Sequence, residues 1–478
     1  NTTASYNTAV GNNALLDNTT GDSLVAVGHS ALRSNTTAHN STAVGYGALS
    51  TATTGSGNTA VGKSAMALTT TASNNVAVGI SALTNNTTGS YNSALGQNAL
   101  FNTTTGQRNV ALGSYALYTA TTAGDNIAIG YEALELTTTG SNNVAIGFRC
   151  MDDNTTGASN TAIGYAALSA NTTASNNTAV GRAALAANTT GYQNCAIGKE
   201  ALDANTTGNS NNAFGFQALS GMDTGSQNNA FGTMALKNAT GSARNNAFGQ
   251  QALEDCTSGS NNTAMGHDAA REITSADNCS GFGHAVLQSL TTGDENTAFG
   301  KGAMASATTA PRNDAFGSDA MGSLTTGQDN VGIARQSFPN LTTGNGNIGI
   351  GNIGVISQLF NVTTQSDRLL LGHTNIGNAY IKVALTVTSD ERDKIDFGVV
   401  PYGLDFVNKL KPKSFWMRKG RDSEEKNGPQ RYGFVAQDIL ALEGDNPVII
   451  DTEEDHHLKY KGEHLVPVLV NAIQELSA

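Results

Sequence analysis

A glycine at every seventeenth residue, from Gly11 to Gly317 without interruption, is the feature that most constrains this chain. The spacing continues through Ala334 to Gly351, so the repeat fills about the first three quarters of the sequence. Helical-hairpin repeats need roughly thirty residues or more, and a unit this short therefore predicts one coil of a β-solenoid or β-roll. At ~4.8 Å per coil, about twenty coils predict a rod roughly 95 Å long.

Because the unit recurs so often, each of its positions can be compared along the chain itself. Asparagine usually stands four residues before the register glycine and alanine two before it, as in the Asn-Thr-Ala-Val-Gly segment that ends at Gly62. The residue directly before the glycine is bulky and apolar, and it changes from Val10 through Ile129 to Phe214. This alternation predicts a strand with one bulky and one small-residue face, and stacked asparagines predict an amide ladder.

The interior of such a coil is expected to be small. One bulky strand residue and one leucine per coil predict a thin core, whose volume grows along the rod as valine gives way to phenylalanine. We therefore expect copies of the chain to wind side by side as a homotrimer, with the small-residue face toward the common axis. The four cysteines occupy different places in the repeat, which favours buried free thiols over stacked disulfides.

The repeat also resembles repeats of known protein families. The Asn-Thr-Ala-Val-Gly pentad resembles the head repeats of trimeric autotransporter adhesins, which form trimeric left-handed parallel β-rolls. The arrays rich in Asn-Thr-Thr-Gly are similar to those in tail-fibre proteins of marine phages. The resemblance covers about residues 1–351.

The chain changes character after the repeats. Between residues 352 and 388 the register dissolves, and residues 369–371 and 379–388 predict strands of a short β neck. From Ser389 onward the sequence holds five of the seven prolines and the only tryptophan, Trp416. The sequence thus predicts an all-β solenoid shaft at 1–351, a neck at 352–388 and a small α+β domain at 389–478.

Residues 389–394, Ser-Asp-Glu-Arg-Asp-Lys, resemble the start of the intramolecular chaperone domain of phage tail spikes and tail fibres, a self-cleaving peptidase family. Three further blocks match that family in order, at residues 410–416, 433–438 and 465–476. The resemblance spans 389–478 and implies a chaperone motif that includes Asp390, Arg392, Gly433, Phe434, Ala436 and Gln437.

A serine hydroxyl needs a base to take its proton, and a lysine whose ammonium is destabilised by burial can serve. Ser389 and Lys394 are five residues apart, within reach if the segment turns once. The resemblance implies that Ser389 attacks the carbonyl of Thr388, so that a Ser-Lys endopeptidase acting only in cis cleaves between Thr388 and Ser389. The alternative is that Ser389 only caps a helix, since Ser-Asp-Glu-Arg is also a good helix start.

The end of the chain predicts a helix. Leu465, Leu469, Ala472 and Leu476 follow the spacing of a coiled-coil seam, which a domain that registers three chains would use. The alternative is an amphipathic helix that packs on its own domain.

Two groups of histidines raise the question of metal binding. His456 and His457 lie among acidic residues, a pattern more typical of a solvated loop. His29, His267 and His284 share the position after the register glycine, where they are either exposed histidines or, in a trimer, ion ligands. We expect no cofactor and no resident metal. The shaft is expected to hold no turnover enzyme, since its acids form no recurring carboxylate pair.

Composition narrows the function. Lysine and arginine are sparse and the net charge is −12, which argues against nucleic-acid binding. Apolar runs are too short for membrane insertion. The chain starts in mid-pattern at Asn1, which predicts a fragment that lacks its N-terminal anchor. This composition agrees with an exposed extracellular protein, and the resemblance of the C-terminal domain implies a virion tail fibre that binds a host cell-surface receptor, expected to be a glycan. The alternative is a cell-surface adhesin or an ice-binding solenoid.

Overall fold

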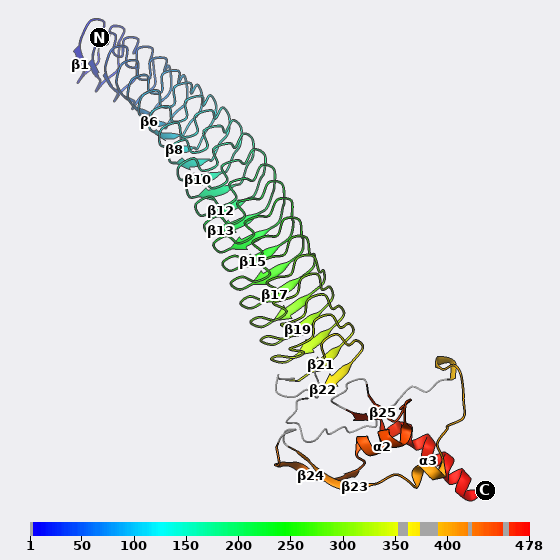
Figure 1. Cartoon of the computed structure of the whole chain (residues 1–478). Coiled ribbons are helices and arrows are strands. Elements are labelled where there is room, and N and C mark those ends of the chain that lie inside the picture. The colour runs from blue at the N-terminus through cyan, green and yellow to red at the C-terminus, as the bar shows by residue number, and fades with distance from the viewer. Residues whose placement is uncertain (1–2, 352–361, 373–390, 419–422, 453–457) are drawn as a thin grey trace.

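The computed structural model describes residues 3–351, 362–372, 391–418, 423–452 and 458–478 (Figure 1). The repeats stack into a long, gently curved rod, and each coil gives a three-residue strand to one parallel sheet of 22 strands. The strands are β1 Thr8–Val10, β2 Val25–Val27, β3 Thr42–Val44, β4 Thr59–Val61, β5 Val76–Val78, β6 Ser93–Leu95, β7 Val110–Leu112, β8 Ile127–Ile129, β9 Val144–Ile146, β10 Thr161–Ile163, β11 Thr178–Val180, β12 Cys195–Ile197, β13 Asn212–Phe214, β14 Asn229–Phe231, β15 Asn246–Phe248, β16 Thr263–Met265, β17 Ser280–Phe282, β18 Thr297–Phe299, β19 Asp314–Phe316, β20 Val331–Ile333, β21 Ile348–Ile350 and β22 Leu369–Leu371. The predicted β-solenoid with 17-residue coils is confirmed.

The strands pair in the register of the repeat. Ala26 pairs with Ala43, and Ala43 pairs with Ala60 one coil further along. From β21 to β22 the spacing lengthens, since Ile348 pairs with Leu369. The strand predicted at 369–371 is therefore present as a further rung of the solenoid. The strand predicted at 379–388 lies outside the described residues, and the domain limits remain a prediction.

The sequence expectation for the two faces of the strand is wrong. In β3 the central Ala43 is fully buried, whereas Thr42 and Val44 on either side of it are only half-buried. The interior of each coil is filled by the small strand residue together with the alanine and leucine that follow the glycine, as with Ala48 and Leu49. Because this interior is narrow, the bulky residue that ends each strand points outward. The drift from valine to phenylalanine thus enlarges the outer surface and not the core.

Substitutions inside the coil compensate one another in volume. At Phe338, which replaces the usual leucine, the facing strand position is Gly349, where a Cβ would lie 2.5 Å from the Phe338 ring. At Val286, which replaces the usual alanine, the facing position is Gly281, where a Cβ would lie 3.1 Å from Val286 Cγ1. Interiors are close-packed, so a larger side chain on one wall requires a smaller one opposite.

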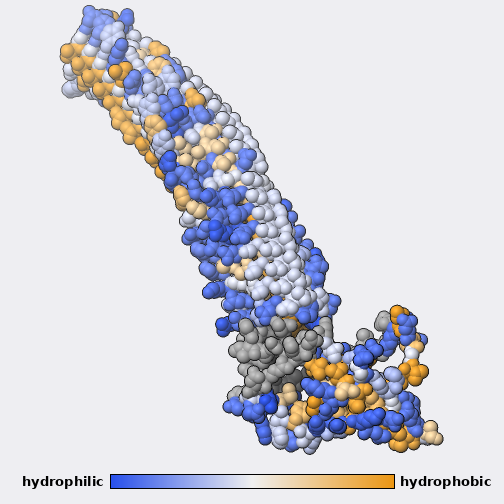
Figure 2. All heavy atoms as spheres, viewed as in Figure 1, coloured by the Kyte–Doolittle hydropathy of each residue, from blue (hydrophilic) through white to orange (hydrophobic). Residues whose placement is uncertain are grey.

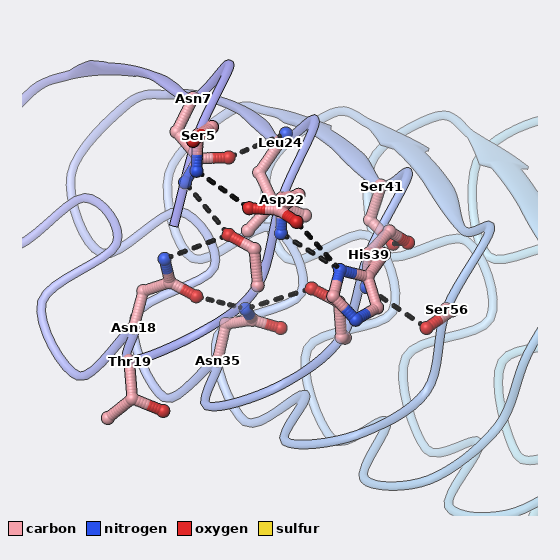
Figure 3. A network of polar contacts seen from close by, with 12 residues as sticks. Ser5, Asn7, Asn18, Thr19, Asp22, Leu24, Asn35, His39, Ser41 and Ser56 are labelled. Atoms are coloured by element: carbon pink, nitrogen blue, oxygen red, sulfur yellow. Dashed lines mark hydrogen bonds and ion pairs between the residues drawn. The ribbon is translucent and has the colours of Figure 1, made fainter. Parts of the chain in front are cut away.

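Buried amides link the coils, as predicted. Figure 3 shows the first coils, where Leu24 N donates to Asn7 Oδ1 (2.9 Å) and Asn35 Nδ2 donates to Asn18 Oδ1 (2.7 Å). A third column, whose bonds in these coils are exposed and do not involve amide side chains, uses the residue six before the glycine, since Asp22 N donates to His39 Nδ1 (3.0 Å). The buried asparagine amides thus supply hydrogen bonds in place of the water that the narrow interior excludes.

The cysteines are free, as expected. Cys150, Cys256 and Cys279 are buried, and Cys195 is half-buried in β12. Burial raises the pKa of the Cys150 and Cys256 thiols to about 12 and that of Cys279 to about 11. These thiols behave as small apolar side chains.

The C-terminal region holds short helices and strands around its own small core. Its elements are the 3-10 helix η2 Glu391–Asp393, α1 Leu404–Val407, β23 Lys413–Arg418, β24 Lys426–Gly433, α2 Ala436–Glu443, β25 Ile450–Asp451, β26 Lys459–Tyr460 and α3 Gly462–Ser477. Strands β23 and β24 pair antiparallel, as do β25 and β26. Phe406, Ile439 and Leu465 bring α1, α2 and α3 together in the core.

Candidate functional site in the C-terminal region

The predicted cleavage site lies at the start of this region. Thr388, Ser389 and Asp390 fall outside the described residues, so the nucleophile and the cleaved bond remain predictions. Just after them the chain turns once through η2, and Lys394 N donates to the Glu391 carbonyl (3.1 Å). The side chains of Arg392 and Lys394 are exposed. The described residues thus turn once between Glu391 and Lys394, and the approach of Lys394 to Ser389 stays a prediction.

The motif at 433–437 forms the junction between β24 and α2. A Cβ at Gly433 would lie 3.2 Å from Phe415 Cε1, so glycine lets that ring approach the backbone. Phe434 packs on the core, and its ring centroid lies 6.0 Å from that of Tyr460. Ala436 begins α2 against the same core, whereas Gln437 is exposed. Three of these motif residues therefore support the fold, and Gln437 is available for contacts beyond it.

The block at 410–416 joins the β23–β24 hairpin to α2. Lys413 Nζ lies 3.0 Å from Asp438 Oδ2, across from strand to helix. Lys426 Nζ lies 3.9 Å from the centre of the Trp416 ring, a cation–π contact between the two strands. Both pairs are partly exposed, so they orient the hairpin more than they stabilise it.

Glu443, which the sequence did not single out, is a buried acid with three backbone hydrogen bonds. Its buried carboxylate accepts hydrogen bonds from the backbone N–H of Val448 (2.8 Å), Ile449 (2.7 Å) and Ile450 (3.0 Å). A carboxylate held by three amides is a structural clamp on the loop before β25. A single glutamate at the end of a helix carries no sequence signal for this role.

Helix α3 holds the segment that leads into α1. Glu475 Oε2 accepts a hydrogen bond from Leu404 N (2.6 Å), and Asn471 Nδ2 donates to the Tyr402 carbonyl (2.9 Å). A Cβ at Gly403 would lie 2.0 Å from Glu475 Oε1, so a side chain there would displace the Glu475 carboxylate from its bond to Leu404 N. The C-terminal helix is therefore fastened to the start of its own domain.

The predicted coiled-coil seam is divided by this packing. Leu465 and Ala472 are buried in the domain core with Val468, whereas Leu469 and Leu476 are exposed. One face of α3 thus follows the alternative, an amphipathic helix packed on its own domain. A second apolar face remains outside, with Ile473 62% exposed beside Leu476 at 72%. A coiled coil through this outer face stays a prediction.

The rod carries an aromatic ladder at the position after the register glycine. The rings of Tyr131, Phe148 and Tyr165 stack nearly parallel, with centroids 5.5 and 5.4 Å apart. The Arg182 guanidinium lies 6.0 Å from the Tyr165 ring centre. Because neighbouring rings cover each other's faces, the ladder presents edges and hydroxyls to solvent.

The comparisons with known proteins concern the C-terminal region. Residues 389–446 match the Peptidase_S74 family, described as chaperone of endosialidase. The match implies a self-cleaving, peptidase-like domain, and together with the solenoid it fits a tail fibre that carries a C-terminal chaperone. A comparison with curated proteins finds no match. Within the described residues, no helix has both the length and the apolar character to cross a bilayer.

Proposed function

We propose that the chain is the shaft of a trimeric viral tail fibre or spike, whose C-terminal domain assembles three copies and then cuts itself off between Thr388 and Ser389. The released shaft would attach the virion to a host cell-surface receptor. The observation that carries the proposal is an apolar column on the outside of the rod.

We call this column the outer stripe, defined as the last residue of every strand from β1 to β22. All of these residues are large and apolar. Many stay exposed in the single chain, as do Val10 at 57%, Ile163 at 38% and Phe316 at 39%. The first residues of the same strands face the same way, and the only charged one among them is Asp314. Figure 2 shows apolar surface along one edge of the rod where the N-terminal strands lie.

The size of the stripe supports a permanent interface. Twenty-two strands at ~4.8 Å give a length of about 100 Å, and a width of roughly 10 Å makes its area on the order of 1,000 Å². Stable interfaces bury about 800 Å² per partner, and monomers rarely expose larger apolar patches. A second copy in the same register offers the same apolar column along its whole length. Three copies around one axis agree with the resemblance of the repeats to trimeric autotransporter adhesins. They also agree with the resemblance of the C-terminal domain to the chaperones of phage tail fibres.

The proposed cleavage needs only groups of the chain and one water molecule. Ser389 Oγ attacks the Thr388 carbonyl carbon while Lys394 accepts the hydroxyl proton. The tetrahedral intermediate then breaks its bond to the Ser389 nitrogen, and that amine accepts the proton from Lys394. Thr388 is left as an ester on Ser389 Oγ. Water then hydrolyses the ester to a Thr388 carboxylate and a free serine. Lys394 is exposed in the single chain. Covering it by assembly would favour its neutral form, which couples cleavage to assembly.

Intact mass and native mass of the purified protein test the proposal. The wild type should give a fragment that begins at Ser389 and a shaft of three chains. Ser389→Ala should give an uncleaved trimer, Ser389→Cys should retain slow cleavage, and Lys394→Ala should assemble but cut far more slowly than Lys394→Arg. Equal cleavage of wild type and Ser389→Ala would overturn the nucleophile. A stable monomeric rod would overturn the assembly.

A glycan is the receptor class we propose, because the exposed edges of the aromatic ladder offer phenol hydroxyls such as those of Tyr131 and Tyr165. Binding of the trimer to a glycan array, with loss of signal in a Tyr131→Ala, Tyr165→Ala double variant, is the measurement. Signal that survives in the double variant would place the receptor contact elsewhere.

The alternative function is a cell-surface adhesin or an ice-binding solenoid. Its best support is a regular column of exposed threonines, including Thr37, Thr54 and Thr71. The threonine before each is engaged, since Thr36 Oγ1 donates to the Thr53 carbonyl (3.1 Å) and Thr53 Oγ1 to the Thr70 carbonyl (3.1 Å). The hydroxyls of this neighbouring column are thus taken up by bonds between coils and do not add to the exposed one. Thermal hysteresis of the purified rod would decide for ice binding.

A further inference from the structure

Two histidines and one aspartate meet on consecutive coils near the end of the rod. His267 and His284 each follow a register glycine, so the repeat stacks their rings with centroids 5.4 Å apart and planes 8° apart. Asp268 Oδ2 lies 2.8 Å from His267 Nδ1. One ligand atom from each of the three residues lies within 4.8 Å of the other two.

The aspartate of this cluster is not an ordinary surface acid. Its side chain is only 15% exposed, and Oδ1 is buried without a hydrogen-bond partner among the described residues. The backbone fixes it there, because Asp268 has a left-handed φ of 55° and its N donates to Gln250 O (3.1 Å). Arg271, the nearest cation along the chain, binds Glu254 Oε2 through Nε (2.9 Å) and acts on Asp268 only through space. A buried carboxylate oxygen with no partner is costly unless a cation joins it.

The geometry points to a binding site for one divalent transition-metal ion, formed by His267, His284 and Asp268. Two imidazole nitrogens and one carboxylate oxygen select Zn²⁺, Ni²⁺ or Cu²⁺ over Mg²⁺ and Ca²⁺, which prefer oxygen ligands alone. Three protein ligands leave room for water or a further ligand. This assignment does not depend on the proposed function, and it departs from the sequence expectation of no resident metal.

Only small movements are needed to close the site. Metal–ligand bonds of about 2.0 to 2.2 Å place ligand atoms roughly 3 to 3.5 Å apart. His267 Nδ1 and Asp268 Oδ2 are already 2.8 Å apart, and a pair at the 4.8 Å limit needs to approach by about 1 Å. His267 is about half exposed, with a relative side-chain exposure of 46%, and its ring can turn without disturbing the coil. The bound ion would tie two consecutive coils together from outside and stabilise the folded rod by mass action.

The repeat supplies its own matched substitutions. His29 occupies the same position as His267, and its ring stacks on Tyr46 in the next coil with centroids 5.0 Å apart. His284→Tyr should therefore keep the stacking and remove one metal ligand. Asn13 and Asn98 occupy the position of Asp268 with φ of 58° and 56°, so Asp268→Asn should keep the backbone and weaken the carboxylate ligand.

The test is titration of the tag-free full chain with ZnCl2 by calorimetry, with CuSO4 and electron paramagnetic resonance to count bound nitrogens. The wild type should take up one more Zn²⁺ per chain than His284→Tyr, and Cu²⁺ should show two imidazole nitrogens. Asp268→Asn should bind at least about tenfold more weakly. His29→Tyr should bind like the wild type. Equal Zn²⁺ uptake by wild type and His284→Tyr, with both folded by circular dichroism, would overturn the site, as would a Cu²⁺ signal unchanged by that substitution.

Discussion

A Cβ atom placed on Gly113 would lie 2.3 Å from the carbonyl oxygen of Gly130 in the next coil. The register glycines repeat this relationship along the rod, and Gly113 itself has a φ of 142°. At Gly113 two backbones thus meet with no room for a Cβ, in a conformation that L-residues rarely adopt; Ala334, with a φ of 126°, is the one alanine in this column. This explains why the glycine period is the least variable feature of the sequence.

Gly113→Ala should therefore destabilise the rod by more than about 3 kcal/mol, because backbone must shift in two coils. The matched control is Gly47→Ser. A Cβ there would meet only Ser64 Oγ at 4.0 Å, and serine already occupies the equivalent places Ser30 and Ser64 with φ of 58°. The control should cost less than about 1 kcal/mol. Guanidinium unfolding followed by circular dichroism measures both, and equal costs would contradict the close approach of the backbones.

The buried asparagine column supports a second prediction. Asn92 Oδ1 accepts a hydrogen bond from Asn109 N (3.0 Å), and Asn92 Nδ2 donates to Gly106 O (2.9 Å). Asn92→Ala leaves both backbone groups buried and unpaired, which should cost about 2 to 4 kcal/mol. Gln97→Ala, an exposed amide in the same coil, should change stability by less than about 0.5 kcal/mol. The difference between the two unfolding midpoints is the measurement, and no difference would exclude a stabilising ladder.

The buried thiols predict a loss of stability at high pH. Burial raises the pKa of Cys150 to about 12 in the folded rod, whereas an unfolded thiol ionises near ~8.5. The folded state therefore binds the thiol proton more tightly than the unfolded state. The resulting contribution to the free energy of unfolding is complete below about pH 8.5 and is lost as the pH rises toward 12. By about pH 10.5 the loss from this thiol should reach about 2 to 3 kcal/mol.

Cys150→Ala isolates that contribution, because alanine occupies the same place in the neighbouring coils as Ala133 and Ala167. The unfolding midpoint of the variant should fall less steeply than that of the wild type between pH 8 and 10.5. Parallel slopes for the two proteins would mean that Cys150 is not protected by burial in solution.

The periodic glycine was enough to predict the solenoid, the coil length and the asparagine ladder, since each follows from spacing alone. It did not predict which strand face turns inward. Alternation places Ala162 and Ile163 on opposite faces of the strand but does not show which face is buried. The general preference for large residues in protein cores favoured the face of Ile163, and that choice was wrong. The paired changes at Gly281 with Val286 and at Gly349 with Phe338 were the available signal, because only residues that share one interior compensate in volume.

Other features left no trace in the pattern. Leu32 is buried with a left-handed φ of 49°, and the same holds for Leu49, although leucine gives no hint of that conformation. The clamp at Glu443 depends on a loop that closes only in the folded domain. The motif residues Gly433, Phe434 and Ala436 lie together at one junction, as their spacing implies, whereas the pairing of Ser389 with Lys394 stays a prediction.

The outward position of the bulky residues leads to the last prediction. Ile163 ends β10 in the outer stripe, and Tyr165 stands two residues further along in the aromatic ladder. Both are exposed in the single chain, at 38% and 55%. Lysine is accommodated at the ladder position, where Lys63 and Lys199 already occur. Ile163→Lys places a charge in the proposed interface, whereas Tyr165→Lys places one beside it.

If copies associate through the outer stripe, Ile163→Lys should weaken the assembly because each of the three chains would bury an unpaired ammonium. The trimer should then dissociate at a lower denaturant concentration than the wild type, while Tyr165→Lys should change little. Sedimentation velocity across a denaturant series, with circular dichroism to confirm that each chain keeps its coils, provides the readout. Equal assembly of both variants would remove the stripe as the interface and make the outer face of α3, with Ile473 and Leu476, the next apolar surface to test for self-association.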